Sequence, residues 1–340
     1  MSLAQQRERK STEDVLASYM NEEKLFMHYQ PIIDIHKESV IGFEALTRFP
    51  PTTYFKSPVE LFQFADQTNR LFQLEKHTRE LAIDSITDHL QNEQQLWVNL
   101  TPNVIHDDSF SPGFTHAVLK NTSLNPDQIV FEITEHSAIS DFQSFRKLLT
   151  HYREQGFKVA IDDVGAGYSS LQMISELKPD YMKIDRSLII DIDQFREKQY
   201  MVEALQHIGK KLGAGIIAEG VETEGECLQL IQMGISLMQG YYFAKPGYPP
   251  PPLPRSISEQ LKQQRNSKMF PLNIDKGTTF SELMTWISAY QGSYDHHSAL
   301  IHDTNGKKVI PLTEVVRFVT FNHSKKEATV WTHLQSWFNK

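Results

Sequence analysis

Residues 181–221 read YMKIDRSLIIDIDQFREKQYMVEALQHIGKKLGAGIIAEGV, and this stretch contains one complete strand–helix–strand unit. The run at 181–185 is short and apolar, as is typical of a buried strand. Residues 193–212 carry apolar side chains at helical spacing. The predicted apolar face consists of Met201, Leu205, Ile208 and Leu212. Gly213 and Gly215 then stop the helix before the next apolar run, so the stretch predicts a βαβ unit.

The same alternation of apolar runs and helical patterns extends from about residue 25 to residue 246. Eight strands are predicted, at residues 25–35, 40–49, 95–101, 128–135, 158–164, 181–185, 215–221 and 237–244. Eight strands with helices between them, arranged around a parallel sheet, are typical of a (β/α)8 barrel of roughly 250 residues. The predicted fold class is therefore α/β, with a TIM-like barrel as the main domain.

The composition of the 340 residues is that of a soluble globular protein, with 40% hydrophobic and 22% charged residues. The net charge of −8 makes binding to polyanionic nucleic acid unexpected. The single cysteine, Cys227, cannot form an intrachain disulfide and is predicted to be buried. No apolar run approaches the roughly 20 residues that span a bilayer, and the start carries no signal-peptide pattern. A cytoplasmic protein without a membrane span is expected.

The predicted domain organisation has four parts. Residues 1–23 are an N-terminal leader or helix, residues 24–250 the barrel, residues 251–270 a proline-rich linker and helix, and residues 271–340 a small C-terminal α/β module. The module is short for a rich core, so it is interpreted as sensory or truncated. A linker helix is predicted before the module, at 256–268. Within the module, the predicted elements are a helix at 280–290, strands at 297–302 and 329–334, and a turn at 303–306. A PAS-like sensory module and part of a LytTR-like DNA-binding unit both stay open.

Ionisable and amide side chains stand near the ends of the apolar runs. They are Glu44, Asn99, Glu132, Glu135, Asp162, Asp163, Lys183, Glu219 and Gln239. The carboxyl ends of barrel strands form the active-site face, so these groups are expected to meet there. Charges are rarely buried unless they are paired or bind metal. Oxygen donors without histidine or cysteine suit hard cations such as Mg²⁺ or Mn²⁺.

The adjacent pair Asp162 and Asp163 precedes a glycine-rich turn at 165–167. If regular strand geometry relaxes there, both carboxylates face one site. One of them can then bridge two metal ions about 3.5–4 Å apart. The pair therefore favours a two-metal site.

Each of these residues taken alone has a simpler interpretation. A single glutamate at a strand end is usually a solvated cap or a salt-bridge partner. An asparagine such as Asn99 is usually a turn residue. A lysine such as Lys183 usually keeps its charge at the surface over a buried stem. Such polar residues occur at the ends of seven predicted strands, and their common position favours one shared site.

An ordered series of motifs over about residues 24–246 resembles the EAL phosphodiesterase family. The motifs are YQP at 29–31, GFEALTRF at 42–49, VNLTP at 98–102, FEITE at 131–135, IDDVGAGYSSL at 161–171, KIDRS at 183–187, AEGVET at 218–223 and QGY at 239–241. The departures are small. Thr47 and Phe49 stand where the family often has an aliphatic residue and tryptophan, and Val164 and Ala166 stand where phenylalanine and threonine are usual.

The resemblance implies a role for each matching residue. The ligands of the first metal match Glu44, Asn99, Glu132 and Asp162, and those of the second match Asp162, Asp163 and Glu219. Lys183 matches the lysine beside the attacking water, and Gln239 matches a glutamine at the catalytic mouth. Gln30 and Arg48 match residues that contact the dinucleotide. Glu135 matches the glutamate that holds the loop after Asp163.

The activity implied by the resemblance is hydrolysis of the bacterial second messenger cyclic di-GMP to linear pGpG. Two Mg²⁺ or Mn²⁺ ions per site and a homodimer are expected with it. The alternative is a catalytically weak cyclic di-GMP receptor that signals through its C-terminal module. A transcriptional regulator is a third interpretation, for which the basic pairs at 307–308 and 325–326 are modest support.

Overall fold

A computed structural model describes the chain in several stretches. These are residues 16–20, 24–51, 54–91, 93–111, 113–134, 142–167, 170–267, 273–274, 279, 283–284, 287, 298–303 and 306–321. The chain divides into two compact units. The first holds residues 1–227 and 235–254, and the second holds residues 228–234 and 255–340.

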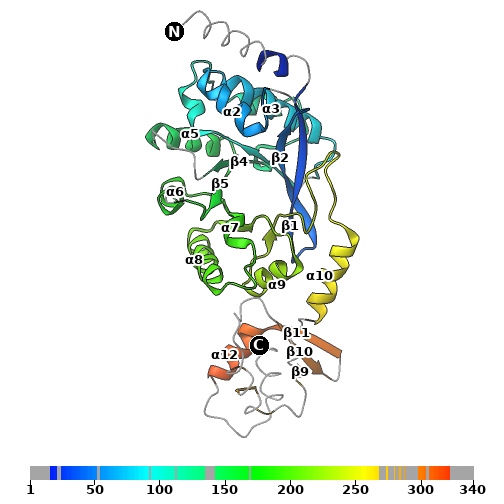
Figure 1. Ribbon diagram of the computed structural model, residues 1–340. Helices are drawn as coiled ribbons and strands as arrows, with labels where there is room; N and C mark the ends of the chain where they lie inside the picture. The colour runs from blue at the N-terminus through cyan, green and yellow to red at the C-terminus, as the bar shows by residue number, and fades with distance from the viewer. Residues whose placement is uncertain are drawn as a thin grey trace, which may run out of the picture. The chain divides into compact units, whose positions relative to one another are not determined.

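Eight strands close into a barrel in sequence order, which confirms the predicted barrel (Figure 1). The strands are β1 Phe26–Asp34, β2 Ser39–Arg48, β3 Gln95–Asn99, β4 Ile129–Thr134, β5 Lys158–Val164, β6 Tyr181–Ile184, β7 Gly215–Ala218 and β8 Leu237–Met238. Neighbours from β2 to β8 pair in parallel.

The parallel arrangement expected from the βα units does not extend to β1, which runs antiparallel to both β2 and β8. The cause lies in the connection between β1 and β2. Only the turn at residues 35–38 separates these strands. A parallel pair needs a crossover of a dozen or more residues, so two strands joined this closely must form a hairpin.

Helices follow the strands and lie outside the barrel, as Figure 1 shows for α5, α6 and α8. They are α2 Pro58–Gln67, α3 Leu71–Ile86, α4 Phe114–Leu119, α5 Phe142–Glu154, α6 Ser170–Leu177, α7 Arg186–Ile189, α8 Arg196–Leu212 and α9 Glu224–Gln232. Two 3₁₀ helices, η1 Pro102–His106 and η2 Pro126–Gln128, complete the connections. The start of α2 is set locally by the sequence. Ser57 caps this helix by accepting a hydrogen bond from the backbone N–H of Glu60.

Helix α8 lies where the sequence predicted it but turns a different face inward. Its buried residues are Val202, Leu205 and Gly209. The predicted face was therefore partly wrong, since Met201 is 55% exposed and Leu212 is 47% exposed. Gly209 explains the rotation. A Cβ at that position would lie 2.5 Å from Cδ1 of Ile216, so the missing side chain lets α8 pack directly on β7.

The barrel interior is filled by one side chain from each of several strands. The buried cluster consists of Ile32, Trp97, Val130, Ala160 and Ile217, with Ile41, Tyr181 and Leu237 packed against it. A second cluster joins Leu16 and Tyr19 to residues of α2 and α3, so the helical residues 16–20 pack on the barrel unit. Cys227 is 1% exposed, as predicted.

The second unit contains α10 Arg255–Ser267, α12 Leu312–Phe321 and a sheet in the order β11–β10–β9. The strands are β9 Asn273–Ile274, β10 Ser298–Asp303 and β11 Gly306–Pro311. The linker helix and the strand near 297–302 were predicted. The strand β11 and the helix α12 were not predicted; Lys307 and Lys308 stand before Val309 and leave β11 only a short apolar run.

Two further predictions for this unit fall at least partly on residues that the structure does not describe. The strand predicted at 329–334 and most of the helix predicted at 280–290 lie outside the described residues. Among the helices that are described, none has the length and apolar character needed to cross a membrane.

Candidate active site

The side chains of the site follow from the two-residue repeat of the strands. Residues two apart on a strand point to the same side. The buried residues Trp97, Val130, Ala160 and Ile217 point into the barrel. The residues two positions further along their strands are Asn99, Glu132, Asp162 and Glu219. The buried cluster of Ile32, Trp97, Val130, Ala160 and Ile217 forms an apolar plug inside the barrel. The polar groups therefore form the next layer above this plug, at the carboxyl ends of the strands.

The same rule places the remaining predicted residues. Lys183 lies two residues after Tyr181, and Gln239 lies two residues after Leu237. Because β1 runs in the opposite direction, Gln30 precedes Ile32 by two residues, and it pairs in register with Glu44. Gly42 lies two residues before Glu44 and leaves room for the plug. A Cβ there would collide with the Gln95 carbonyl oxygen and would lie 3.0 Å from Nε1 of Trp97.

Lys183 is the centre of the site. It is completely buried. Its ammonium nitrogen lies 2.5 Å from Glu219 Oε1, 2.7 Å from Glu132 Oε1, 3.1 Å from Asp162 Oδ1 and 3.5 Å from Glu44 Oε2. Burial alone would lower the pKa of Lys183. The four carboxylates outweigh burial and raise that pKa well above its ordinary value, so the lysine stays charged.

The carboxylates carry more negative charge than Lys183 can offset. Burial, first of all, raises the pKa of Glu132 and of Glu219 well above the ordinary value, and neighbouring carboxylates add to the rise. Glu132 Oε2 accepts no hydrogen bond from any described residue. An unsatisfied buried carboxylate oxygen beside other carboxylates is the environment that a divalent cation compensates.

Asp162 and Asp163 both reach the site because β5 is irregular there. The pairing of β5 with β6 shifts register between Ile161 and Val164, and Asp163 has a left-handed φ of 58°. The carboxylate oxygens of Asp162, Asp163 and Glu219 lie within 4.8 Å of one another. The bulge thus turns two consecutive side chains toward one point, as the sequence analysis required.

Gln239 and Gln30 make hydrogen bonds that fix their amides. Gln239 Nε2 donates to Glu44 Oε2 at 2.7 Å, which holds this carboxylate in place. Gln30 Nε2 donates to the Ala244 carbonyl at 3.3 Å. Arg48 ends β2, and its guanidinium donates to the Thr47 carbonyl at 2.9 Å.

The loop that carries Glu219 is held by a residue that the sequence analysis missed. The Glu226 carboxylate is 2% exposed. It accepts hydrogen bonds from the backbone N–H groups of Glu222 at 2.8 Å, Thr223 at 3.0 Å and Asp191 at 3.0 Å. The motif of Thr223 followed by a glutamate three residues later is a capping box, which could have revealed this role.

A cavity of about 570 Å³ opens over the site. Its polar lining includes Glu44, Arg48, Asn99, Asp162 and Asp163, and apolar side chains such as those of Phe62 and Leu71 form the remainder. Glu75 and Arg79 of α3 also line it, and neither was predicted from the sequence. A cavity with carboxylates, two arginines and apolar walls suits a phosphate ester that carries a flat apolar group.

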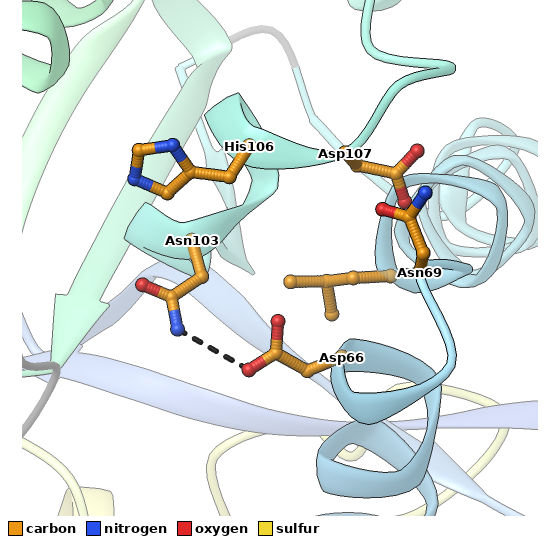
Figure 2. A pocket seen from close by; sticks show the side chains of 6 residues that line it. Asp66, Asn69, Asn103, His106 and Asp107 are labelled. Carbon is orange, nitrogen blue, oxygen red and sulfur yellow. Dashed lines mark hydrogen bonds between the residues drawn. The ribbon is translucent and has the colours of Figure 1, made fainter.

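A smaller hollow of about 350 Å³ lies beside this cavity and shares Asp66 and Leu71 with it. Figure 2 shows Asn103 and Asp66 facing each other there, with Asn103 Nδ2 donating to Asp66 Oδ2 at 3.2 Å. None of the predicted site residues lines this hollow.

Glu135 is the one predicted site residue that lies outside the described residues. The remaining predicted residues meet at the barrel mouth, and their individual roles stay predictions.

Stability without metal should fall as pH rises. The folded-state pKa values of Glu132 and Glu219 lie above the ordinary value of 4.5, so the folded protein retains protons that the unfolded chain has lost. Stability from these groups is present below pH 4.5 and is lost as pH rises through their raised values. The thermal midpoint in EDTA should therefore decrease over this range. Thermal melts of Glu219→Gln should show a flatter pH dependence, and equal slopes in the two proteins would contradict the assignment.

Comparisons with known proteins agree with one another on the barrel. Residues 13–246 match the family model described as EAL domain. An uncharacterized signaling protein of Caulobacter vibrioides is 31% identical over 242 residues, which cover 71% of this chain and 30% of the relative. The probable cyclic di-GMP phosphodiesterase PdeB of Escherichia coli K12 is 29% identical over 222 residues, which cover 64% of this chain and 42% of the relative.

A solved structure gives the same result. Klebsiella pneumoniae BlrP1, in a calcium/cy-diGMP complex, aligns with a TM-score of 0.60 and 35% identity, covering 66% of this chain and 56% of that chain. The chain spans about a third of the length of the curated relatives it matches first, between 30% and 42% of each.

Proposed function

Because this chain belongs to the EAL domain family, we propose that its barrel hydrolyses cyclic di-GMP to linear pGpG. The observation that carries the proposal is the buried ammonium of Lys183 among four carboxylates from β2, β4, β5 and the end of β7. The phosphodiesterase name of PdeB and the cy-diGMP complex of BlrP1 support the choice of substrate.

The donor set fits two hard divalent cations, Mg²⁺ or Mn²⁺. In the proposal, Glu44, Asn99, Glu132 and Asp162 hold the first, and Asp162, Asp163 and Glu219 hold the second. The close approach of the second group of carboxylate oxygens supports this division. When bound, the two cations offset the charge of the phosphodiester and lower the pKa of a water molecule.

The side chains of the chain have separate tasks in the hydrolysis. Lys183 orients the attacking water and offsets the charge that develops on the phosphate. Glu219 would be ionised beside the bound cations and would accept the proton of that water. The water oxygen forms a new bond to phosphorus, the bond to the 3′ oxygen breaks, and the proton passes to that 3′ oxygen. Gln239 holds Glu44, while Arg48 and Gln30 contact the dinucleotide.

Removal of metal should abolish turnover. All proposed ligands are oxygen donors, so EDTA should reduce pGpG formation to background, and Mg²⁺ or Mn²⁺ should restore it. Chromatography of the products after each addition provides the measurement. Full turnover in metal-free buffer would contradict a metal-dependent reaction.

The alternative function is a catalytically weak cyclic di-GMP receptor. Such a receptor would signal to a partner through the C-terminal module. The proposed ligands described by the structure are all present at the mouth, which favours the enzyme. Isothermal titration beside the turnover assay separates the two, because a receptor binds cyclic di-GMP without cleaving it. A homodimer and a cytoplasmic location stay predictions.

A further inference from the structure

We propose that the buried ion pair Glu75–Arg79 of α3 is a positioning device for the metal ligand Asn99. The inference rests on the proposed function, because it assigns the pair to the metal site. Glu75 and Arg79 lie one helical turn apart, with Arg79 Nη2 3.2 Å from Glu75 Oε2 and both side chains 3% exposed. Both line the cavity over the site.

The link from the pair to the site is a backbone hydrogen bond. Glu75 Oε1 accepts from the N–H of Thr101 at 2.8 Å. Thr101 lies two residues after Asn99, where β3 has ended and the regular ladder no longer holds the chain. The N–H of Leu100 donates to the Glu132 carbonyl at 2.8 Å. Of the two peptide groups after Asn99, the first is thus tied to β4 and the second to Glu75.

Arg79 keeps the Glu75 carboxylate in place. Its Nη1 donates to Thr115 Oγ1 at 3.0 Å, and its guanidinium lies 5.1 Å from the ring centre of Phe131. Burial raises the pKa of Glu75, and the charge of Arg79 opposes that rise. The pair therefore presents an oriented acceptor to Thr101. The guanidinium of Arg79 lies over the ring of Phe131, the residue before the ligand Glu132.

The energetics of burial favour a positioning role over a purely stabilising one. Two buried charges lose their hydration, so apolar residues of similar volume often give equal or greater stability. An apolar pair would pack α3 against the barrel but would leave the Thr101 N–H without its acceptor. The pair provides that acceptor and a defined geometry. Groups that orient metal ligands typically change metal affinity or activity by about 10- to 100-fold when they are removed.

Two double variants test the proposal, because they differ only in the acceptor. Glu75→Leu/Arg79→Met removes the charges and the acceptor, whereas Glu75→Gln/Arg79→Met removes the charges and keeps an amide oxygen for Thr101. Mn²⁺ binding is measured without cyclic di-GMP, from the paramagnetic resonance signal of free Mn²⁺. The leucine variant should need roughly 10- to 100-fold more Mn²⁺ for half-saturation. The glutamine variant should stay within about 3-fold of wild type, and equal values for the two variants would overturn the proposal.

Thermal melts of both variants provide the control for folding. Arg146→Met/Glu176→Leu removes a largely exposed ion pair of the same barrel and should leave Mn²⁺ binding unchanged. If the leucine variant does not fold, Thr101→Pro removes the backbone N–H that donates the same hydrogen bond to Glu75. The φ of −85° at Thr101 is close to the range of proline. Wild-type Mn²⁺ affinity in that variant would overturn the positioning role.

The Mn²⁺ titration also separates this inference from the proposed function. A wild-type protein that binds Mn²⁺ but leaves cyclic di-GMP intact would contradict the phosphodiesterase alone. Loss of Mn²⁺ affinity in the leucine variant would support the positioning role in that case too.

Discussion

Asp162→Asn is expected to lower kcat/KM for cyclic di-GMP hydrolysis by about 10³-fold or more. Asp162 belongs to both proposed metal groups and contacts Lys183 at 3.1 Å. The substitution keeps the shape of the side chain and removes one negative charge from the residues that would hold the two cations. A metal cluster contributes several kcal/mol to transition-state stabilisation, and roughly 4 kcal/mol corresponds to this factor. Steady-state kinetics at saturating Mn²⁺ would measure the loss.

Asp127→Asn is the matched control for this experiment. Asp127 lies in η2, directly before β4, and is exposed at the opposite end of that strand from the site. Its substitution should leave kcat/KM unchanged. Comparable rates in Asp162→Asn and Asp127→Asn would remove Asp162 from the catalytic site.

Lys183→Met is expected to lower kcat by about 10²-fold or more, while KM changes little. The proposed task of Lys183 is at the attacking water, and a group that acts mainly in the transition state affects kcat more than ground-state binding. The substitution also leaves the Glu132 and Glu219 carboxyls without their buried counter-charge. Removal of one member of a buried ionic network costs about 3–5 kcal/mol, so the metal-free variant should melt at lower temperature.

Two measurements separate these effects of Lys183. Thermal melts with and without Mn²⁺ report stability, and kinetics at saturating Mn²⁺ report catalysis. Lys211→Met, at an exposed position in the last turn of α8, is the control and should alter neither. An unchanged kcat in a folded, Mn²⁺-loaded Lys183→Met protein would contradict the catalytic role of Lys183.

The barrel and its mouth could be predicted because the strand repeat and the strand-end chemistry are both local. A side chain two residues beyond a plug residue must lie above it, which places Glu132 after Val130 and Glu219 after Ile217. The adjacent aspartates required a departure from this repeat. The left-handed φ of Asp163 supplies it, and the glycine-rich turn was its signal.

Features that depend on contacts between distant segments could not be predicted. The inward face of α8 is set by the approach of Ile216 to Gly209, which helical periodicity alone does not reveal. The pair Glu75–Arg79 matches a common surface pattern of charges one turn apart. Its burial becomes evident only when α3 packs beside Thr115 and Phe131.

The most direct test is incubation of the full chain with cyclic di-GMP and Mn²⁺, followed by chromatographic identification of the products. Cyclic di-GMP should disappear and linear pGpG should accumulate in equal amount, with neither change in EDTA or in Asp162→Asn. Cyclic di-GMP that stays intact beside a folded, Mn²⁺-loaded protein would contradict the proposed hydrolysis.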